Sequence, residues 1–143
     1  MTQKEIKVRN WLKRAFYAEK KVKALDMLVR KYRTHAERLS RYRECNYTGG
    51  TENVLNGTEN AFMKLVDMEQ KFSDQKKELE NISKEISEAI ALLHDNELET
   101  VLIHRYLLFH TIVQTAEIMH YSPETIKRKQ RKAIGKLTRY DLV

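Results

Sequence analysis

Glycine, proline and cysteine are scarce in this sequence, whose 143 residues include four glycines, one proline and one cysteine. All-β folds need Gly and Pro in their many turns, so the composition argues against such a fold. The single cysteine, Cys45, excludes an intramolecular disulfide and a cysteine-based zinc finger. The chain lacks an apolar run long enough to span a membrane, and the stretch MTQKEIKVRNWLKRAF lacks the apolar core of a secretory signal. We therefore expect an all-α protein of a reducing cytoplasm.

Charge, by contrast, is abundant and unevenly distributed. The chain has 27 Lys and Arg against 20 Asp and Glu, which gives a formal net charge of +7. Residues 1–58 carry +8, residues 59–95 carry −4 and residues 96–143 carry +3. Within the last block, the stretch 123–139 has seven basic residues and one acidic residue. Such segregation indicates that different segments have different roles.

Two heptad seams occupy the first two thirds of the chain. In each seam, spacings of three and four alternate, which is the pattern of a coiled-coil helix. The first seam comprises Val8, Trp11, Ala15, Ala18, Val22, Leu25, Val29, Tyr32, Ala36 and Leu39. The second comprises Ala61, Leu65, Met68, Phe72, Gln75, Leu79, Ile82, Ile86, Ala89 and Leu93. The run 46–60 is rich in Gly and Asn and predicts a loop, so residues 1–95 are expected to form a long antiparallel helical hairpin with its first helix at about 4–44.

Three short helical patterns follow in residues 96–143, the predicted second domain. They cover residues 96–108, 112–119 and 123–139. Thr111 and Ser122 are suitable N-cap residues for the second and third helices, and Pro123 is a favourable first helical residue. A short helix, a three-residue turn and a longer basic helix predict a helix-turn-helix.

The third of these helices has the composition expected of a DNA-recognition helix. Cations around one helix suit phosphates, and long polar side chains near its N-terminal end suit base edges in the major groove. The face away from the apolar residues predicts base contacts by Glu124, Thr125, Lys127, Arg128 and Arg131. We predict phosphate contacts for five further residues, which lie at the start of the helix, farther along it or around it: Ser122, Lys129, Lys132, Lys136 and Arg139. We therefore expect double-stranded DNA as a partner.

The pieces ETVLIHRYL, TAEIM and YSPETIKRKQRKAIGKL, within about residues 93–137, resemble region 4 of bacterial sigma-70 factors. In that family an alanine of the first helix lets the two helices pack closely, and an Ile or Val of the second fills the core. Ala116 and Ile126 occupy these positions here. The resemblance implies that the family's contacts to the promoter −35 element fall on Glu124, Lys127 and Arg128.

Two positions depart from the sigma pattern. The usual glycine of the turn is His120, and a usually bulky apolar residue is Thr115. The sigma region that binds the promoter −10 element is not recognisable upstream, so a complete sigma factor is not expected. The layout of a charged helical N-terminal part and a sigma-like C-terminal unit resembles the small phage-encoded transcriptional regulators of the ArpU and RinA type, which control late packaging and lysis genes. That resemblance implies a regulator in the cytoplasm of a bacterial host cell.

The sequence also bears on other functions and partners. The five histidines show no metal-ligand spacing and Cys45 has no histidine motif beside it, so we expect no metal, no cofactor and no enzyme activity. One alternative is a phage small terminase subunit, which would bind packaging DNA and form a ring. Another is an adaptor that binds RNA polymerase and hardly touches DNA. Apolar residues beside the first seam predict contact with the C-terminal unit or with a second copy in a homodimer: Ile6, Leu12, Phe16, Met27 and Leu28.

Overall fold

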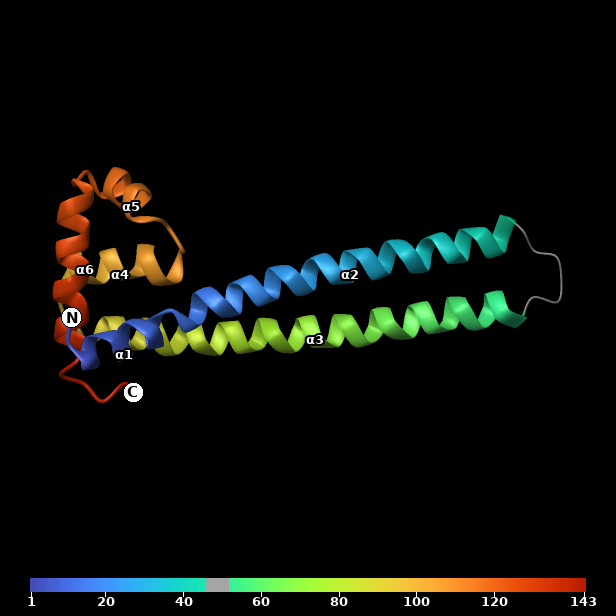
Figure 1. The fold of residues 1–143 in the computed structure, drawn as a ribbon, viewed down its shortest axis with the longest axis horizontal. Helices are drawn as coiled ribbons and strands as arrows, with labels where there is room; N and C mark the ends of the chain where they lie inside the picture. Colours follow the sequence, from blue (N-terminus) through green and yellow to red (C-terminus); the bar gives the residue numbers. More distant parts are fainter. Residues whose placement is uncertain (46–51) are drawn as a thin grey trace. The chain divides into compact units, whose positions relative to one another are not determined.

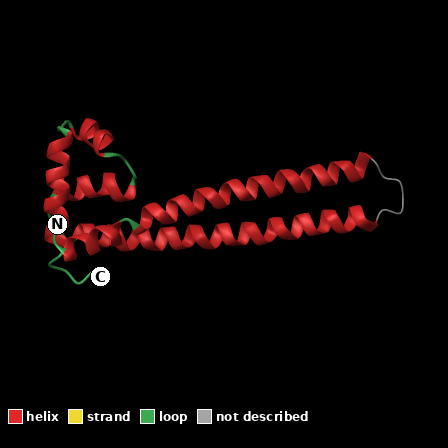
Figure 2. Ribbon diagram, viewed as in Figure 1, coloured by secondary structure: helices red, strands yellow, loops and turns green. Residues whose placement is uncertain are grey.

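The protein is all-α (Figures 1 and 2). A computed structural model describes residues 1–45 and 52–143, and it describes the side chains outside residues 43–56. The elements are α1 (Gln3–Leu12), α2 (Arg14–Cys45), α3 (Glu52–Ala91), α4 (Asn96–Leu102), η1 (Ile103–Leu107), α5 (Ile112–Met119) and α6 (Pro123–Leu137). The long helices α2 and α3 pack antiparallel and small C-terminal helices follow them, which confirms the predicted fold class.

Packing divides the chain into two compact units. The hairpin unit is Lys20–Glu78, and the C-terminal unit combines Met1–Glu19 with Leu79–Val143. The C-terminal unit therefore contains α1 and one end of each long helix besides the small helices. These units divide between residues 19 and 20 and between residues 78 and 79. The predicted boundary between two functional domains at residues 95 and 96 stays a prediction.

The hairpin unit is held together by the two predicted seams. Its core consists of four buried residues, Val29, Ala36, Ala61 and Leu65, with the partly buried Tyr32, Leu39, Met68 and Phe72 packed against them. An ion pair of 3.1 Å between Arg33 and Glu69 joins α2 to α3 beside this core. Because both side chains are exposed, such a pair is worth only about 0.2–1 kcal/mol. The seam residues that form this core are at the predicted positions.

The predicted loop at residues 46–60 is wrong in its second part. Helix α3 begins at Glu52, so residues 52–60 are helical, while residues 46–51 lie outside the described part of the chain. Thr58 is buried and lies three residues before Ala61, so it continues the seam toward the N-terminus of α3. Gly57 weakens a helix interior by about 1 kcal/mol relative to Ala. Seam packing outweighs this local preference.

The C-terminal unit has its own larger core. Val8, Leu12 and Ala15 of the N-terminal helices pack there with residues of α3, α4, η1 and α6. Leu12, which lies beside the first seam, is fully buried in this core. The predicted single helix at 4–44 is interrupted at Lys13, where the side-chain Nε of Arg14 donates to the carbonyl of Trp11 at 3.1 Å. In a continuous helix that carbonyl would accept from a backbone N–H four residues later.

The first small helix is shorter than predicted and changes type. Asp95 is the N-cap of α4, because its carboxylate accepts from the N–H groups of Glu97 and Leu98. After Leu102 the chain continues as the π-helix η1, whose wide turn ends with the N–H of Leu108 donating to the carbonyl of Ile103 at 2.9 Å. The predicted α-helix at 96–108 is therefore corrected to an α-helix followed by a π-helical turn.

Candidate nucleic-acid interface

Helices α5 and α6 form a short helix, a tight turn and a longer helix with the predicted starts. The hydroxyl of Thr111 accepts from the N–H of Gln114 at 3.1 Å, and the Gln114 side chain accepts from the N–H of Thr111 at 2.9 Å. Helix α5 ends at Met119, and the next residue, His120, has a left-handed φ of 59°, which is the conformation that favours glycine. The hydroxyl of Ser122 accepts from the N–H of Thr125 at 3.2 Å at the start of α6. Both predicted N-caps are confirmed, and α6 ends at Leu137 rather than at residue 139.

A small apolar cluster fixes the angle between the two helices. Ile126 of α6 is fully buried and packs with Ala116 of α5 and Val101 of α4. Ala116 is buried in this cluster, at the position for which the resemblance implied close packing of the two helices. Thr115 is also fully buried, and its hydroxyl donates to the carbonyl of Thr111 at 2.8 Å. This bond satisfies the buried hydroxyl, so a threonine can replace the bulkier apolar residue of the sigma pattern.

Most predicted base-contact residues lie exposed on one face of α6: Glu124, Lys127, Arg128 and Arg131. The Glu124 side chain is 84% exposed and that of Lys127 is 46% exposed, and they form a loose ion pair of 3.4 Å. Thr125 is different, because it is half-buried and its hydroxyl is 2.8 Å from that of Ser122. The cap of α6 therefore engages both hydroxyls, and four long side chains remain available at the surface.

The predicted phosphate contacts are less uniform. Lys132 and Arg139 are exposed, and Lys136 is half-buried. Ser122 is exposed and caps α6. Lys129 differs from the other cations, because its side chain is only 19% exposed and its Nζ lies 2.7 Å from a carboxylate oxygen of Glu97.

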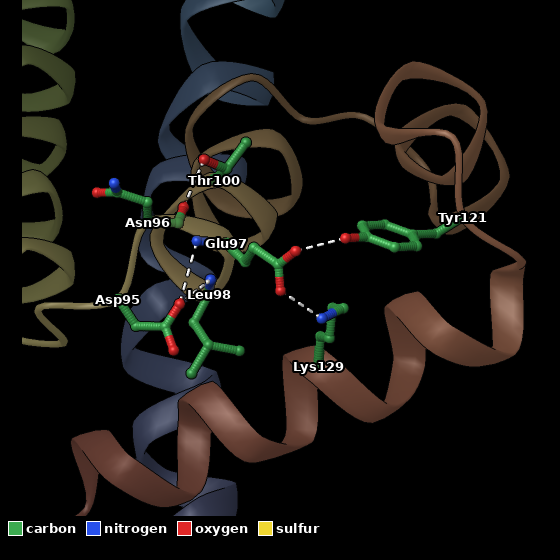
Figure 3. Close-up of polar contacts among 7 residues, drawn as sticks. All are labelled: Asp95, Asn96, Glu97, Leu98, Thr100, Tyr121 and Lys129. Carbon is green, nitrogen blue, oxygen red and sulfur yellow. Dashed lines mark hydrogen bonds and ion pairs between the residues drawn. The ribbon is translucent and has the colours of Figure 1, made fainter.

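Lys129 belongs to a polar cluster that joins α6 to α4 (Figure 3). Its ammonium lies 5.0 Å from the ring centre of Tyr121, and the Tyr121 hydroxyl donates to the other carboxylate oxygen of Glu97. The hydrogen bond from Lys129, followed by that from Tyr121, holds the pKa of Glu97 below its usual value. The bond to Glu97 in turn raises the pKa values of Lys129 and Tyr121. Lys129 thus has an internal acidic partner, and its contact with a phosphate stays a prediction.

The sequence contained a signal for this position of Lys129. It lies three residues after Ile126 and four before Ala133, both of which are fully buried. Helical residues three and four apart share a face, so Lys129 flanks the inward side of α6. Gln130 lies four residues from both Ile126 and Ile134 and is inward for the same reason.

Sequence reasoning missed a hydrogen-bonded chain beneath α6. The Nε of Arg105 donates to the Gln130 side-chain oxygen at 2.9 Å, and Gln130 Nε2 donates to the Tyr106 hydroxyl at 3.1 Å. Arg105 also donates to the carbonyl of His110 at 2.7 Å. Burial raises the pKa of Tyr106, so its hydroxyl stays protonated. These hydrogen bonds join α6 to η1 and to His110, the residue before the N-cap of α5.

Two histidines meet beside this chain. The Nδ1 atoms of His104 and His110 are 3.0 Å apart, and the rings stack. Burial, followed by the charge of His110, lowers the pKa of His104. Within the described residues, no group of three or more His, Cys, Asp or Glu side chains is placed to hold a metal ion.

Comparison with known proteins adds no relative to this description. No protein-family model, curated protein or solved structure matches the chain. Among the helices of the described residues, none is long and apolar enough to cross a membrane.

Proposed function

We propose that this protein is a sequence-specific, double-stranded DNA-binding transcriptional regulator of phage or prophage late genes, with α6 in the major groove. The main support is the exposed face of α6, where Arg128 and Arg131 lie within a helix that is fixed by its cap and by the cluster around Ile126. Phosphates need cations at the surface, and base readout needs long polar side chains on a rigid helix. The sigma-like sequence pieces support the same function and a site of action in the cytoplasm of a bacterial host.

The arrangement of charge supports DNA more than a solvated surface helix. Solvated helices usually pair opposite charges at spacings of three and four. In α6 the only acid is Glu124, which is paired loosely with Lys127. Lys132 and Arg128 also lie exposed on this helix. Their mutual repulsion would be relieved by an anionic partner.

The test is selection of a DNA site from random duplexes, followed by affinity measurements on that site. Lys127→Ala and Arg128→Ala should each weaken binding by about 1–3 kcal/mol and relax the sequence preference. Lys136→Ala should weaken binding to all duplexes about equally and lower the salt slope by about one unit. Lys84→Ala is the matched control, because Lys84 is an exposed lysine of α3. Unchanged binding in the Lys127 and Arg128 variants would refute the role of α6.

Two further outcomes would redirect the proposal. A mass in solution that corresponds to eight or more subunits would favour the small terminase subunit. Capture of RNA polymerase without any DNA binding at low salt would favour the adaptor. A monomer or dimer that selects a defined site is the result expected for the regulator.

A further inference from the structure

A groove of about 620 Å³ lies along one flank of α6, within the C-terminal unit. The groove is lined by residues of α1, α5 and α6 and by the first residue of the chain: Met1, Glu5, Arg9, Ile112, Lys127, Gln130 and Arg131. Three of these seven side chains are cations, and one is an acid. The single acid, Glu5, accepts from the backbone N–H of Thr2 at 3.0 Å as part of the cap of α1.

Arg9 is the unusual residue of this groove. Its Nε is buried and has no hydrogen-bond partner among the described residues. Its Nη1 lies 3.9 Å from the sulfur of Met1, which is a weak acceptor. A partly buried cation without a good acceptor is unfavourable unless an anion approaches it. The groove therefore favours an anionic ligand.

The neighbours of Arg9 strengthen this preference. Lys127 and Arg131 are four residues apart on α6 and so lie on the same side of the helix. The partner of Lys127, Glu124, is highly exposed and 3.4 Å away, so it neutralises the lysine only weakly. Gln130 is held by Arg105 and Tyr106 beneath the groove and does not supply a negative charge.

We propose that Arg9 binds a phosphate of the DNA backbone in this groove, next to the bases that Lys127 and Arg131 contact. A guanidinium suits this ligand because its planar donors match two phosphate oxygens. The contact would extend the DNA interface from α6 to α1. It would also fix the position of α6 along the major groove of the DNA. The inference rests on the proposed DNA-binding function, and it adds a residue from the other end of the sequence.

The test compares Arg9→Gln with Lys7→Gln in the full chain. Both variants remove one positive charge from α1, but Lys7 is exposed and does not line the groove. On the selected duplex, Arg9→Gln should lower the slope of log K against log salt by about 0.9 unit and weaken binding about tenfold at low salt. Lys7→Gln should change both quantities much less. Phosphate-ethylation interference should show one phosphate whose modification weakens the wild type but not Arg9→Gln.

A structural role of Arg9 would give a different result. Arg9→Gln should not lower the unfolding midpoint, because it removes a buried Nε that has no hydrogen-bond partner among the described residues and gives up only a weak polar contact to Met1. If Arg9→Gln is instead less stable, Arg9→Lys keeps the charge and should restore the salt slope.

The remaining outcomes separate the two proposals. If the wild type binds DNA and Arg9→Gln behaves like Lys7→Gln, the groove assignment is wrong while the proposed function stands. If inorganic phosphate stabilises the protein through Arg9 but the salt slope on DNA does not change, the groove binds a small anion and the assignment is also wrong. If no variant and no wild-type protein binds DNA at low salt, both proposals fail.

Discussion

Replacing Ile126 by alanine tests whether the cluster beneath α6 holds the proposed DNA-binding helix in place. Ile126 is fully buried against Val101 and Ala116. The change removes three carbons, which at about 0.8 kcal/mol each corresponds to about 2.4 kcal/mol of lost burial. A residual cavity of about 40 Å³ would add about 1 kcal/mol. We therefore expect the C-terminal unit to lose about 3.4 kcal/mol of stability.

Urea unfolding followed by tryptophan fluorescence is the appropriate assay. Trp11 is the only tryptophan in the chain, and it packs against the core of the C-terminal unit. With a slope of about 1.5 kcal/mol per molar urea, the midpoint should fall by about 2 M. If Ile126→Ala is unfolded without urea, Ile126→Val should still fold and shift the midpoint by about 0.7 M, since this smaller change costs about 1 kcal/mol.

A matched control lies on the neighbouring helix. Ile118 of α5 is 49% exposed, so Ile118→Ala should change stability by less than about 0.5 kcal/mol. Equal midpoints for Ile126→Ala and Ile118→Ala would refute the role of the cluster. Normal DNA affinity in a destabilised Ile126→Ala protein would show that α6 does not need this packing to bind.

Three other changes test the fold and the polar cluster. Gly57→Ala should stabilise the hairpin unit by up to about 1 kcal/mol, because Gly57 lies inside α3 and its added Cβ would meet no atom within 4 Å. Thermal unfolding followed by circular dichroism measures this change, and destabilisation would contradict a helix at this position. Glu97 has a lowered pKa in the folded state, so its stabilising effect is present above the unfolded value of about 4.5 and is lost as the pH falls through the folded value. The difference in urea midpoint between wild type and Glu97→Gln should therefore shrink as the pH falls below about 4.5, with Glu117→Gln, at an exposed residue of α5, measured in parallel as the control. Ile86→Asp should unfold the C-terminal unit, because it buries an unpaired charge at a fully buried position; an unchanged Trp11 midpoint would argue against the seam.

Local patterns in the sequence predicted much of the fold. The heptad spacing placed residues such as Val29 and Ile86 in the cores, and both are buried. The caps at Thr111 and Ser122 were also predictable, because a cap needs only a suitable side chain and an N–H group two or three residues later. These features depend on neighbouring residues, so a single sequence contains the necessary information.

The errors arose where distant residues decide the outcome. Composition predicted a loop through residue 60, but the seam continues through Thr58 and extends α3. The break at Lys13 and the π-helical turn after Leu102 have no comparable local signal in the sequence. The position of Arg9 beside α6 depends on how α1 packs in the C-terminal unit, which spacing along one helix does not reveal.

The charge that the proposed interface presents to DNA also depends on residues far away in the sequence. It therefore differs from the net charge of residues 123–139. Glu97 neutralises Lys129 from 32 residues away in the sequence, whereas Arg9 adds a cation to the groove from α1. A cation that stays paired with an internal carboxylate neutralises little phosphate charge, so it contributes little to counterion release from the DNA. Lys129→Gln should therefore lower the stability of the C-terminal unit while leaving the salt slope on DNA unchanged. Lys136→Gln should instead lower the salt slope while leaving the stability unchanged. A loss of slope in Lys129→Gln equal to that in Lys136→Gln would mean that Lys129 leaves Glu97 to bind DNA.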